Sequence, residues 1–243
     1  MSNGRPFAVF DIDGTLIRWQ LYHALADELA RQGKLDAAGF QKVREARMAW
    51  KKRSTDDAFS SYENTLVELV DQGIVGITAS YLQSACRSVI AEYADQVYTY
   101  TRDLIKELRA ENYLIFAISA SQLEIVQLLA EHYELDDYGG SVYQVDGSGH
   151  FTGQKTILKS EAKPKYLEQL VERNHASWAG SVAVGDSESD IPMLTRVEQP
   201  IAFNPTKKLY EHAAAHGWPV VVERKNMVYK LEPSDGEYRL NKA

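Results

Sequence analysis

The spacing of apolar residues changes along the chain, and each change predicts a different kind of structure. Residues 7–10 are consecutive apolar or small residues, a pattern typical of a strand buried on both faces of a parallel sheet. Between about 18 and 98 the apolar residues recur at helical spacing, and no strand is expected there. The predicted helices of this segment lie near 21–29, 40–50, 59–70 and 78–90, with a loop at 54–57.

Beyond this segment, short apolar strands alternate with amphipathic helices. The predicted strands lie at 113–119, 181–184, 200–203 and 219–222, with a hairpin over 141–154. The predicted helices lie at 104–108, 123–133, 163–173 and 206–216. Such alternation implies parallel strands joined by crossover helices, so the predicted fold class is α/β, a Rossmann-like three-layer parallel sheet with an inserted helical bundle.

The first strand has no partner nearby in the sequence, and it therefore has to join the sheet formed by the later strands. We accordingly expect a catalytic core made of residues 1–17 and 99–243, and an inserted helical cap made of residues 18–98. A chain of 243 residues is long enough for one large domain that carries such an insertion.

Composition narrows the possible partners. A net charge of -7 argues against a nucleic-acid partner, which usually needs a clustered basic face. The single cysteine, Cys86, excludes an internal disulfide and suits a reducing compartment, and no run of 18 apolar residues predicts a membrane span. Residues 1–6 lack an apolar signal core, so we expect a cytoplasmic protein without membrane contact, either monomer or dimer.

Two carboxylates, Asp11 and Asp13, follow the first strand and precede Gly14 and Thr15. Charged groups at the end of a buried strand are costly unless they are paired or bind a cation, and ligands of open α/β sheets bind at this end. One carboxylate can attack a phosphoryl group, while the second can act as general acid and base. The alternative interpretation is a plain turn before a helix, since Asp and Gly are common turn residues.

Two further polar residues stand at element ends. Ser119 ends an apolar strand, where its hydroxyl and the amides of the next helix could hold phosphate oxygens, although a simple helix N-cap is an equal alternative. Lys163 begins a helix, where the helix dipole disfavours a cation. Neutralising a phosphoryl group would explain its position, and a solvated surface lysine is the alternative.

Asp186 and Asp190 follow another short strand and are four residues apart, so both point to one side of the first helical turn. Two adjacent carboxylates repel each other unless a cation lies between them, and oxygen ligands of this kind suit Mg²⁺. The alternative is that Asp186 only caps the helix.

Taken in order, these residues resemble the four motifs of the haloacid dehalogenase-like (HAD) hydrolases. The motifs are Asp-x-Asp-Gly-Thr at 11–15, the strand-ending Ser119, Lys163, and Gly-Asp-x-x-x-Asp at 185–190. The helical segment between the first two motifs resembles the cap of the phosphoserine-phosphatase-like branch, subfamily IB. The resemblance implies that Ser119 and Lys163 hold the phosphoryl oxygens.

The same resemblance assigns the acidic residues. It implies that Asp11 is the nucleophile and a Mg²⁺ ligand, and that Asp13 is the general acid and base and lends its backbone carbonyl to the metal. It further implies that Asp186 ligates Mg²⁺, with Asp190 and Thr15 in supporting positions.

The chain departs from phosphoserine phosphatases at the residues expected to contact the leaving group. Gln20 stands where that branch usually carries an acidic residue, and Ser119-Ala120-Ser121 replaces the usual Ser-Gly-Gly. Trp19 and Gln20 follow the catalytic loop directly, so we expect them to bind a neutral or apolar leaving group. The alternative for Trp19 is packing of the cap against the core.

The predicted function is a Mg²⁺-dependent phosphomonoesterase that hydrolyses a small phosphorylated metabolite through an aspartyl-phosphate. Two alternatives stay open: a phosphotransferase of the same family, in which another hydroxyl compound replaces water, and a binding protein that keeps the fold without catalysis.

Overall fold

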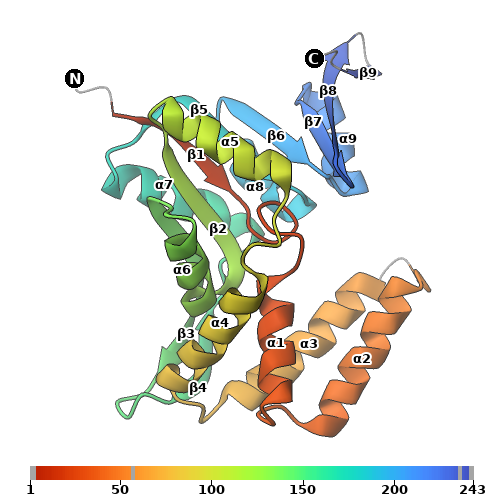
Figure 1. Cartoon of the computed structure of the whole chain (residues 1–243), viewed down its shortest axis with the longest axis vertical. Coiled ribbons are helices and arrows are strands. Elements are labelled where there is room, and N and C mark those ends of the chain that lie inside the picture. The colour runs from red at the N-terminus through yellow and green to blue at the C-terminus, as the bar shows by residue number, and fades with distance from the viewer. Residues whose placement is uncertain (1–3, 56–57, 235–236, 241–243) are drawn as a thin grey trace.

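A mixed sheet forms the centre of the molecule in the computed structural model, which describes residues 4–55, 58–234 and 237–240. In the described residues this sheet has nine strands in the order β4-β3-β2-β1-β5-β6-β7-β8-β9 (Figure 1). The strands are β1 (Pro6–Phe10), β2 (Leu114–Gln122), β3 (Asp137–Val145), β4 (Phe151–Thr156), β5 (Ser177–Gly185), β6 (Gln199–Phe203), β7 (Val220–Arg224), β8 (Met227–Ser234) and β9 (Glu237–Leu240). Strands β3, β2, β1, β5, β6 and β7 run parallel, whereas β4, β8 and β9 pair antiparallel with their neighbours.

Strand β1 lies in the middle because every residue after Pro6 can be buried. Ala8 pairs with Ile115 of β2 on one side and with Val182 of β5 on the other. Alternate side chains point to opposite faces of a strand. Phe10 accordingly belongs to the hydrophobic cluster on one face, and Phe7 to the cluster on the other.

Helices cover both faces of the sheet and make three layers, which confirms the predicted α/β class. On one face lie α5 (Thr99–Ala110) and α6 (Leu123–His132), whose apolar residues join the cluster that contains Phe10. On the other face lie α7 (Lys163–Arg173), α8 (Ile191–Leu194) and α9 (Lys207–His216).

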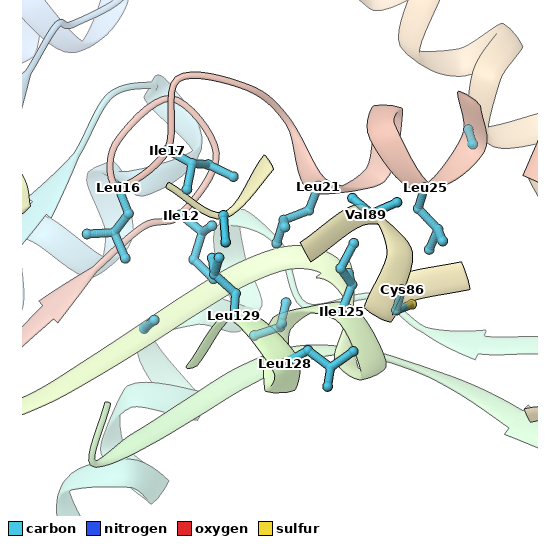
Figure 2. Close-up of a cluster of buried hydrophobic side chains, with 14 of the residues drawn as sticks. Ile12, Leu16, Ile17, Leu21, Leu25, Cys86, Val89, Ile125, Leu128 and Leu129 are labelled. Atoms are coloured by element: carbon cyan, nitrogen blue, oxygen red, sulfur yellow. The ribbon is translucent and has the colours of Figure 1, made fainter. Parts of the chain in front are cut away.

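The segment between β1 and α5 is helical, as its spacing predicts. It contains α1 (Leu21–Arg31), α2 (Ala37–Lys51), α3 (Ala58–Ile74) and α4 (Ala79–Tyr93), grouped at one end of the sheet (Figure 1). Residues 56 and 57 of the expected loop lie outside the described residues. Leu21 and Leu25 of α1 lie near Cys86 and Val89 of α4 and the apolar face of α6 (Figure 2).

Two chain crossings connect this helical segment to the sheet, and they lie side by side. Ile17 and Val97 form an antiparallel bridge. The amide of Arg18 donates to the carbonyl of Gln96 at 2.9 Å, and the amide of Tyr98 donates to the carbonyl of Leu16 at 3.2 Å. The division into a core of 1–17 and 99–243 and a cap of 18–98 stays a prediction, and we call residues 18–98 the predicted cap.

The structure also differs from the expected elements. Strands β8 and β9 lie beyond the last predicted strand, so the sheet is not wholly parallel. Strand β3 begins at Asp137, whereas the expected hairpin begins at 141. The expectation began too late because Gly139 and Gly140 resemble a turn in the sequence. Both glycines are needed for close packing: a Cβ on Gly139 would lie 2.2 Å from the Tyr166 ring, and one on Gly140 would lie 2.8 Å from the Cα of Leu123. Within the described part of the chain, no helix combines the length and apolar character needed to span a bilayer.

Candidate active site

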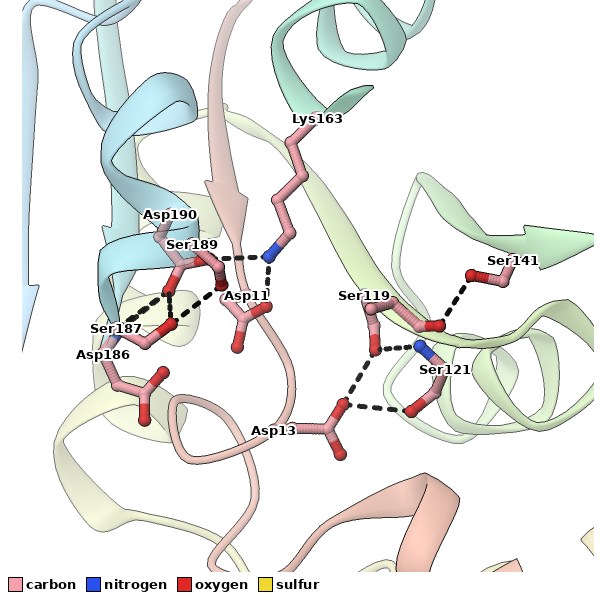
Figure 3. Close-up of polar contacts among 11 residues, drawn as sticks. Asp11, Asp13, Ser119, Ser121, Ser141, Lys163, Asp186, Ser187, Ser189 and Asp190 are labelled. Atoms are coloured by element: carbon pink, nitrogen blue, oxygen red, sulfur yellow. Dashed lines mark hydrogen bonds and ion pairs between the residues drawn. The ribbon is translucent and has the colours of Figure 1, made fainter. Parts of the chain in front are cut away.

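The predicted site residues come from several elements and meet at the carboxyl ends of the parallel strands (Figure 3). Asp11 follows β1, Ser119 lies near the end of β2, and Asp186 follows β5. Lys163 is the first residue of α7 and reaches toward them. Because parallel strands end at the same edge of a sheet, residues far apart in the sequence come together there.

Lys163 is the centre of this cluster. Its Nζ donates to Oδ1 of Asp11 and to Oδ1 of Asp190, each at 2.6 Å. Only 2% of its side chain is exposed, which argues against the alternative of a solvated surface lysine. Burial alone would lower the pKa of this ammonium group, but the two neighbouring carboxylates outweigh burial and raise it. Lys163 is therefore held in its charged form.

Asp190 holds the loop after β5. Its Oδ2 accepts hydrogen bonds from the backbone amides of Asp186 at 3.1 Å and Ser187 at 3.0 Å. Gly185 leaves room for this arrangement, since a Cβ there would lie 2.5 Å from the Cβ of Asp190. With both oxygens engaged by donors, Asp190 is suited to position Asp186 and Lys163, which fits the supporting role expected for it.

Asp11 and Asp186 form the pair of carboxylates best suited to hold a cation. Oxygen atoms of Asp11, Asp186 and Asp190 all lie within 4.8 Å of one another. Burial, with Asp190 adding to it, raises the pKa of Asp11 to about 8, and burial together with Asp11 raises that of Asp186 to about 9. The Asp186 carboxylate accepts no hydrogen bond from the described residues, and Gly14 leaves it room, since a Cβ there would lie 2.3 Å from its Oδ2. A hard cation would relieve this crowding of buried oxygens, so the donor set fits Mg²⁺.

Asp13 faces a different set of partners. Its Oδ2 accepts hydrogen bonds from the hydroxyls of Ser119 at 2.8 Å and Ser121 at 3.2 Å (Figure 3). Its Oδ1 accepts a hydrogen bond from the backbone amide of Leu21 at 2.6 Å, so Asp13 satisfies the first amide of helix α1. Burial raises the pKa of Asp13 against the opposing effect of these hydrogen bonds. In this structure the hydroxyl of Ser119 donates to Asp13. Its expected contact with phosphate oxygens stays a prediction.

Ser121 is a further residue of the site, which the sequence motifs did not indicate. Ser119 and Ser121 are two apart on β2, and alternate side chains of a strand point the same way. The amide of Ser121 also donates to Oγ of Ser119 at 3.0 Å, which fixes the two hydroxyls relative to each other. The two-residue repeat of side-chain direction along a strand is therefore the signal in the sequence that could have identified Ser121.

The three remaining predicted residues lie around the start of α1. Thr15 is buried, and its Oγ1 has no hydrogen-bond partner among the described residues. The same is true of Nε1 of Trp19 and Oε1 of Gln20, both of which are buried atoms. The Trp19 ring lies 5.3 Å from that of Tyr93 on α4, so packing within the predicted cap accounts for part of its environment. Buried polar atoms of this kind are usually completed by ordered water or by a ligand.

Comparisons with known proteins point to one family. The model of the family described as haloacid dehalogenase-like hydrolase matches residues 8–195. The chain is 26% identical to the histidinol-phosphatase of Neisseria meningitidis serogroup C (strain 8013), over 89% of this chain and 98% of that protein. It is also 26% identical to the phosphoserine phosphatase of Methanocaldococcus jannaschii, over 84% of this chain and 87% of that protein.

Solved structures share the fold. A protein of unknown function from Bordetella pertussis Tohama I superposes with a TM-score of 0.72 at 21% identity, covering 90% of this chain and 98% of that one. A phosphoserine phosphatase solved as a phospho-aspartyl intermediate analogue superposes with a TM-score of 0.61 at 20% identity, covering 92% of this chain and 95% of that one.

Proposed function

The chain belongs to the haloacid dehalogenase-like hydrolases, and from that premise we propose that it is a Mg²⁺-dependent phosphatase of small phosphomonoesters that acts through a phosphorylated Asp11. The observation that carries the proposal is the contact of Lys163 with Asp11 at 2.6 Å, beside the carboxylate of Asp186. It supports a nucleophile, a fixed positive charge and a cation site that act together within one cluster. The names of the relatives, a histidinol-phosphatase and a phosphoserine phosphatase, support a small phosphorylated substrate.

Asp11 is the proposed nucleophile because one of its oxygens is free. Lys163 occupies Oδ1, whereas Oδ2 accepts no hydrogen bond from the described residues. Attack by Oδ2 on phosphorus breaks the bond between phosphorus and the leaving oxygen. Lys163 then stabilises the negative charge that spreads over the phosphoryl oxygens. Asp11, Asp186 and the backbone carbonyl of Asp13 would hold Mg²⁺, which would screen the repulsion between the carboxylate and the phosphate.

Asp13 is the proposed general acid and base. Its raised pKa lets its carboxyl hold a proton that it can give to the leaving oxygen. In the second step it takes a proton from the water that attacks phosphorus, and the bond between phosphorus and Asp11 breaks to release phosphate. The hydroxyls of Ser119 and Ser121 orient this carboxyl between the two transfers.

Recognition of the leaving group is assigned to the predicted cap. Trp19 and Gln20 offer an unpartnered indole N–H and an unpartnered amide oxygen at the start of α1. Neither group is charged, so this part of the site favours a neutral or apolar leaving group.

The test is a panel of phosphorylated metabolites assayed with Mg²⁺ and again with a chelator, with Asp11→Asn as the control. We expect turnover of one or more phosphomonoesters that needs both the metal and Asp11. Reduction by borohydride during turnover should convert the phosphorylated residue 11 to homoserine, which mass spectrometry detects. Turnover that persists in chelator, or a homoserine found elsewhere, would contradict the proposal.

A further inference from the structure

A buried carboxylate outside the catalytic cluster holds the two crossings to the predicted cap. Glu223 lies on β7, and its side chain is 0% exposed. Burying a carboxylate is costly unless hydrogen bonds and opposite charge compensate it. No step of the proposed reaction uses this residue, so its cost must be offset by the groups around it.

The partners of Glu223 come from both crossings. Oε1 accepts a hydrogen bond from Nη2 of Arg18, on the first crossing, at 3.4 Å. Oε2 accepts the backbone amide of Tyr100, just after the second crossing, at 2.9 Å. One side chain thus ties together segments that are about eighty residues apart in the sequence.

Aromatic packing reinforces the same junction. The guanidinium of Arg18 lies 5.1 Å from the centre of the Tyr98 ring. The rings of Tyr98 and Tyr100 both pack on Phe203 at the end of β6, at 5.0 Å and 5.6 Å. The crossings are therefore attached to the β6–β7 side of the sheet, and not only to each other.

Glu223 is also connected to the catalytic loop after β5. Its own amide donates to Oδ1 of Asn204 at 2.8 Å. Two residues further along, the amide of Thr206 donates to the backbone carbonyl of Asp186 at 2.8 Å. The turn that supports Glu223 thus contacts the residue proposed to hold the metal.

We propose that Glu223 is a positioning residue, which through Arg18 and the amide of Tyr100 sets the start of the predicted cap relative to the phosphoryl site. The inference rests on the proposed function and extends it. Arg18 directly precedes Trp19 and Gln20, and the amide of Leu21 bonds to Asp13. A shift at Arg18 would therefore move both the leaving-group contacts and the proposed general acid.

The test uses Glu223→Gln, which keeps a hydrogen-bond acceptor but removes the charge that faces Arg18, and Arg18→Met, which removes the other charge. Glu168→Gln is the control for loss of charge, because it removes the same charge from an exposed ion pair with Arg196 that touches neither crossing. The side chain of Arg18 is 42% exposed, so Arg18→Met opens no cavity, and Glu223 keeps the amide of Tyr100 as a partner.

The first measurement is steady-state kinetics on the best phosphomonoester. We expect kcat to fall about tenfold in Glu223→Gln and in Arg18→Met, since misplacement by about 1 Å can cost up to about a hundredfold. The inhibition constant of inorganic phosphate should change less than about twofold, because Asp11 and Lys163 bind it from other elements. An unchanged kcat would overturn the inference, and so would an equal loss of phosphate binding, which indicates general damage.

The second measurement, amide hydrogen exchange, does not depend on activity. In Glu223→Gln and Arg18→Met the amides of Tyr100, Tyr98 and Arg18 should exchange about tenfold faster, while those of β1 and β5 keep their protection. If the wild type hydrolyses no phosphomonoester, the proposed function fails, and exchange still decides whether Glu223 holds the crossings. Exchange that is unchanged, or that rises equally in Glu168→Gln, would overturn the inference.

Discussion

Replacing Lys163 by methionine would leave two buried carboxylates without their cation. The Nζ group is the shared partner of Asp11 and Asp190, at 2.6 Å from each. Methionine has a similar length and no charge, so the change removes the electrostatic contacts without leaving a large cavity. Lys165→Met is the matched control, since Lys165 lies on the same helix with an exposed side chain.

The expected loss of stability follows from burial. Breaking a buried ion pair by removing one partner costs about 3–5 kcal/mol, because the remaining charge is left uncompensated. For a chain of this size that loss corresponds to a fall in Tm of about 10 °C. An exposed lysine such as Lys165 should contribute less than about 0.5 kcal/mol.

The loss should also depend on pH in a defined direction. Burial already raises the pKa of Asp11 to about 8 in the folded protein, against an ordinary value of 3.8, and removing Lys163 takes away a contact that lowers it. A folded-state pKa above the unfolded one gives stability that is fully present below the unfolded pKa and is lost as pH rises through the folded pKa. Below about pH 8 folded wild type and folded variant both hold the Asp11 proton, so the stability deficit of Lys163→Met should grow as pH rises above about 8, where only the wild type loses that proton.

Thermal and urea unfolding in chelator, from about pH 6 to about pH 10, would measure this deficit. Lys163→Met should also lower kcat/KM by at least about a hundredfold at neutral pH, as expected when one charge-stabilising donor is lost. A deficit no larger than that of Lys165→Met, or one that shrinks as pH rises above about 8, would refute the reasoning.

Three other substitutions test separate parts of the proposal. Asp11→Asn should lower turnover by at least about a hundredfold, and Mg²⁺-dependent binding of beryllium fluoride, followed by fluorine NMR, should disappear with it. Asp186→Ala should weaken Mg²⁺ affinity at least about tenfold in calorimetric titration, because Mg²⁺ is usually held by only one or two carboxylates; unchanged affinity would place the metal elsewhere. Gln20→Glu should raise kcat/KM for phosphoserine relative to uncharged phosphomonoesters, and a wild type that already prefers phosphoserine would contradict the assignment of Trp19 and Gln20.

The features predicted correctly from the sequence are those that depend on local pattern. The consecutive apolar residues of 7–10 predict a central strand, and β1 is one, with β2 and β5 on either side. The helical spacing between 18 and 98 likewise agrees with α1 to α4. Polar residues at strand ends were expected to converge, and the hydrogen bonds of Lys163 with Asp11 and Asp190 show that these side chains do meet.

The features that were missed depend on partners outside the segment itself. Strand β8 alternates weakly, and its pairing with β7 decides its conformation more than its own residues do. The partnership of Glu223 with Arg18 joins residues 205 positions apart, and neither residue lies in a recognisable motif. A glutamate near the end of a strand is usually solvated, so its burial becomes visible only when the crossings are in place.

The charge balance of the site explains why a cation belongs to the proposal and not only to the family. Asp11, Asp186 and Asp190 gather oxygens within 4.8 Å, and Lys163 supplies the only positive side chain hydrogen-bonded to them among the described residues. One ammonium group cannot balance three carboxylates in a buried site, so the excess is removed by protonation or by a bound cation. The raised pKa values of Asp11 and Asp186 correspond to protonation. A nucleophile must be deprotonated, and the proposed chemistry therefore requires a bound cation.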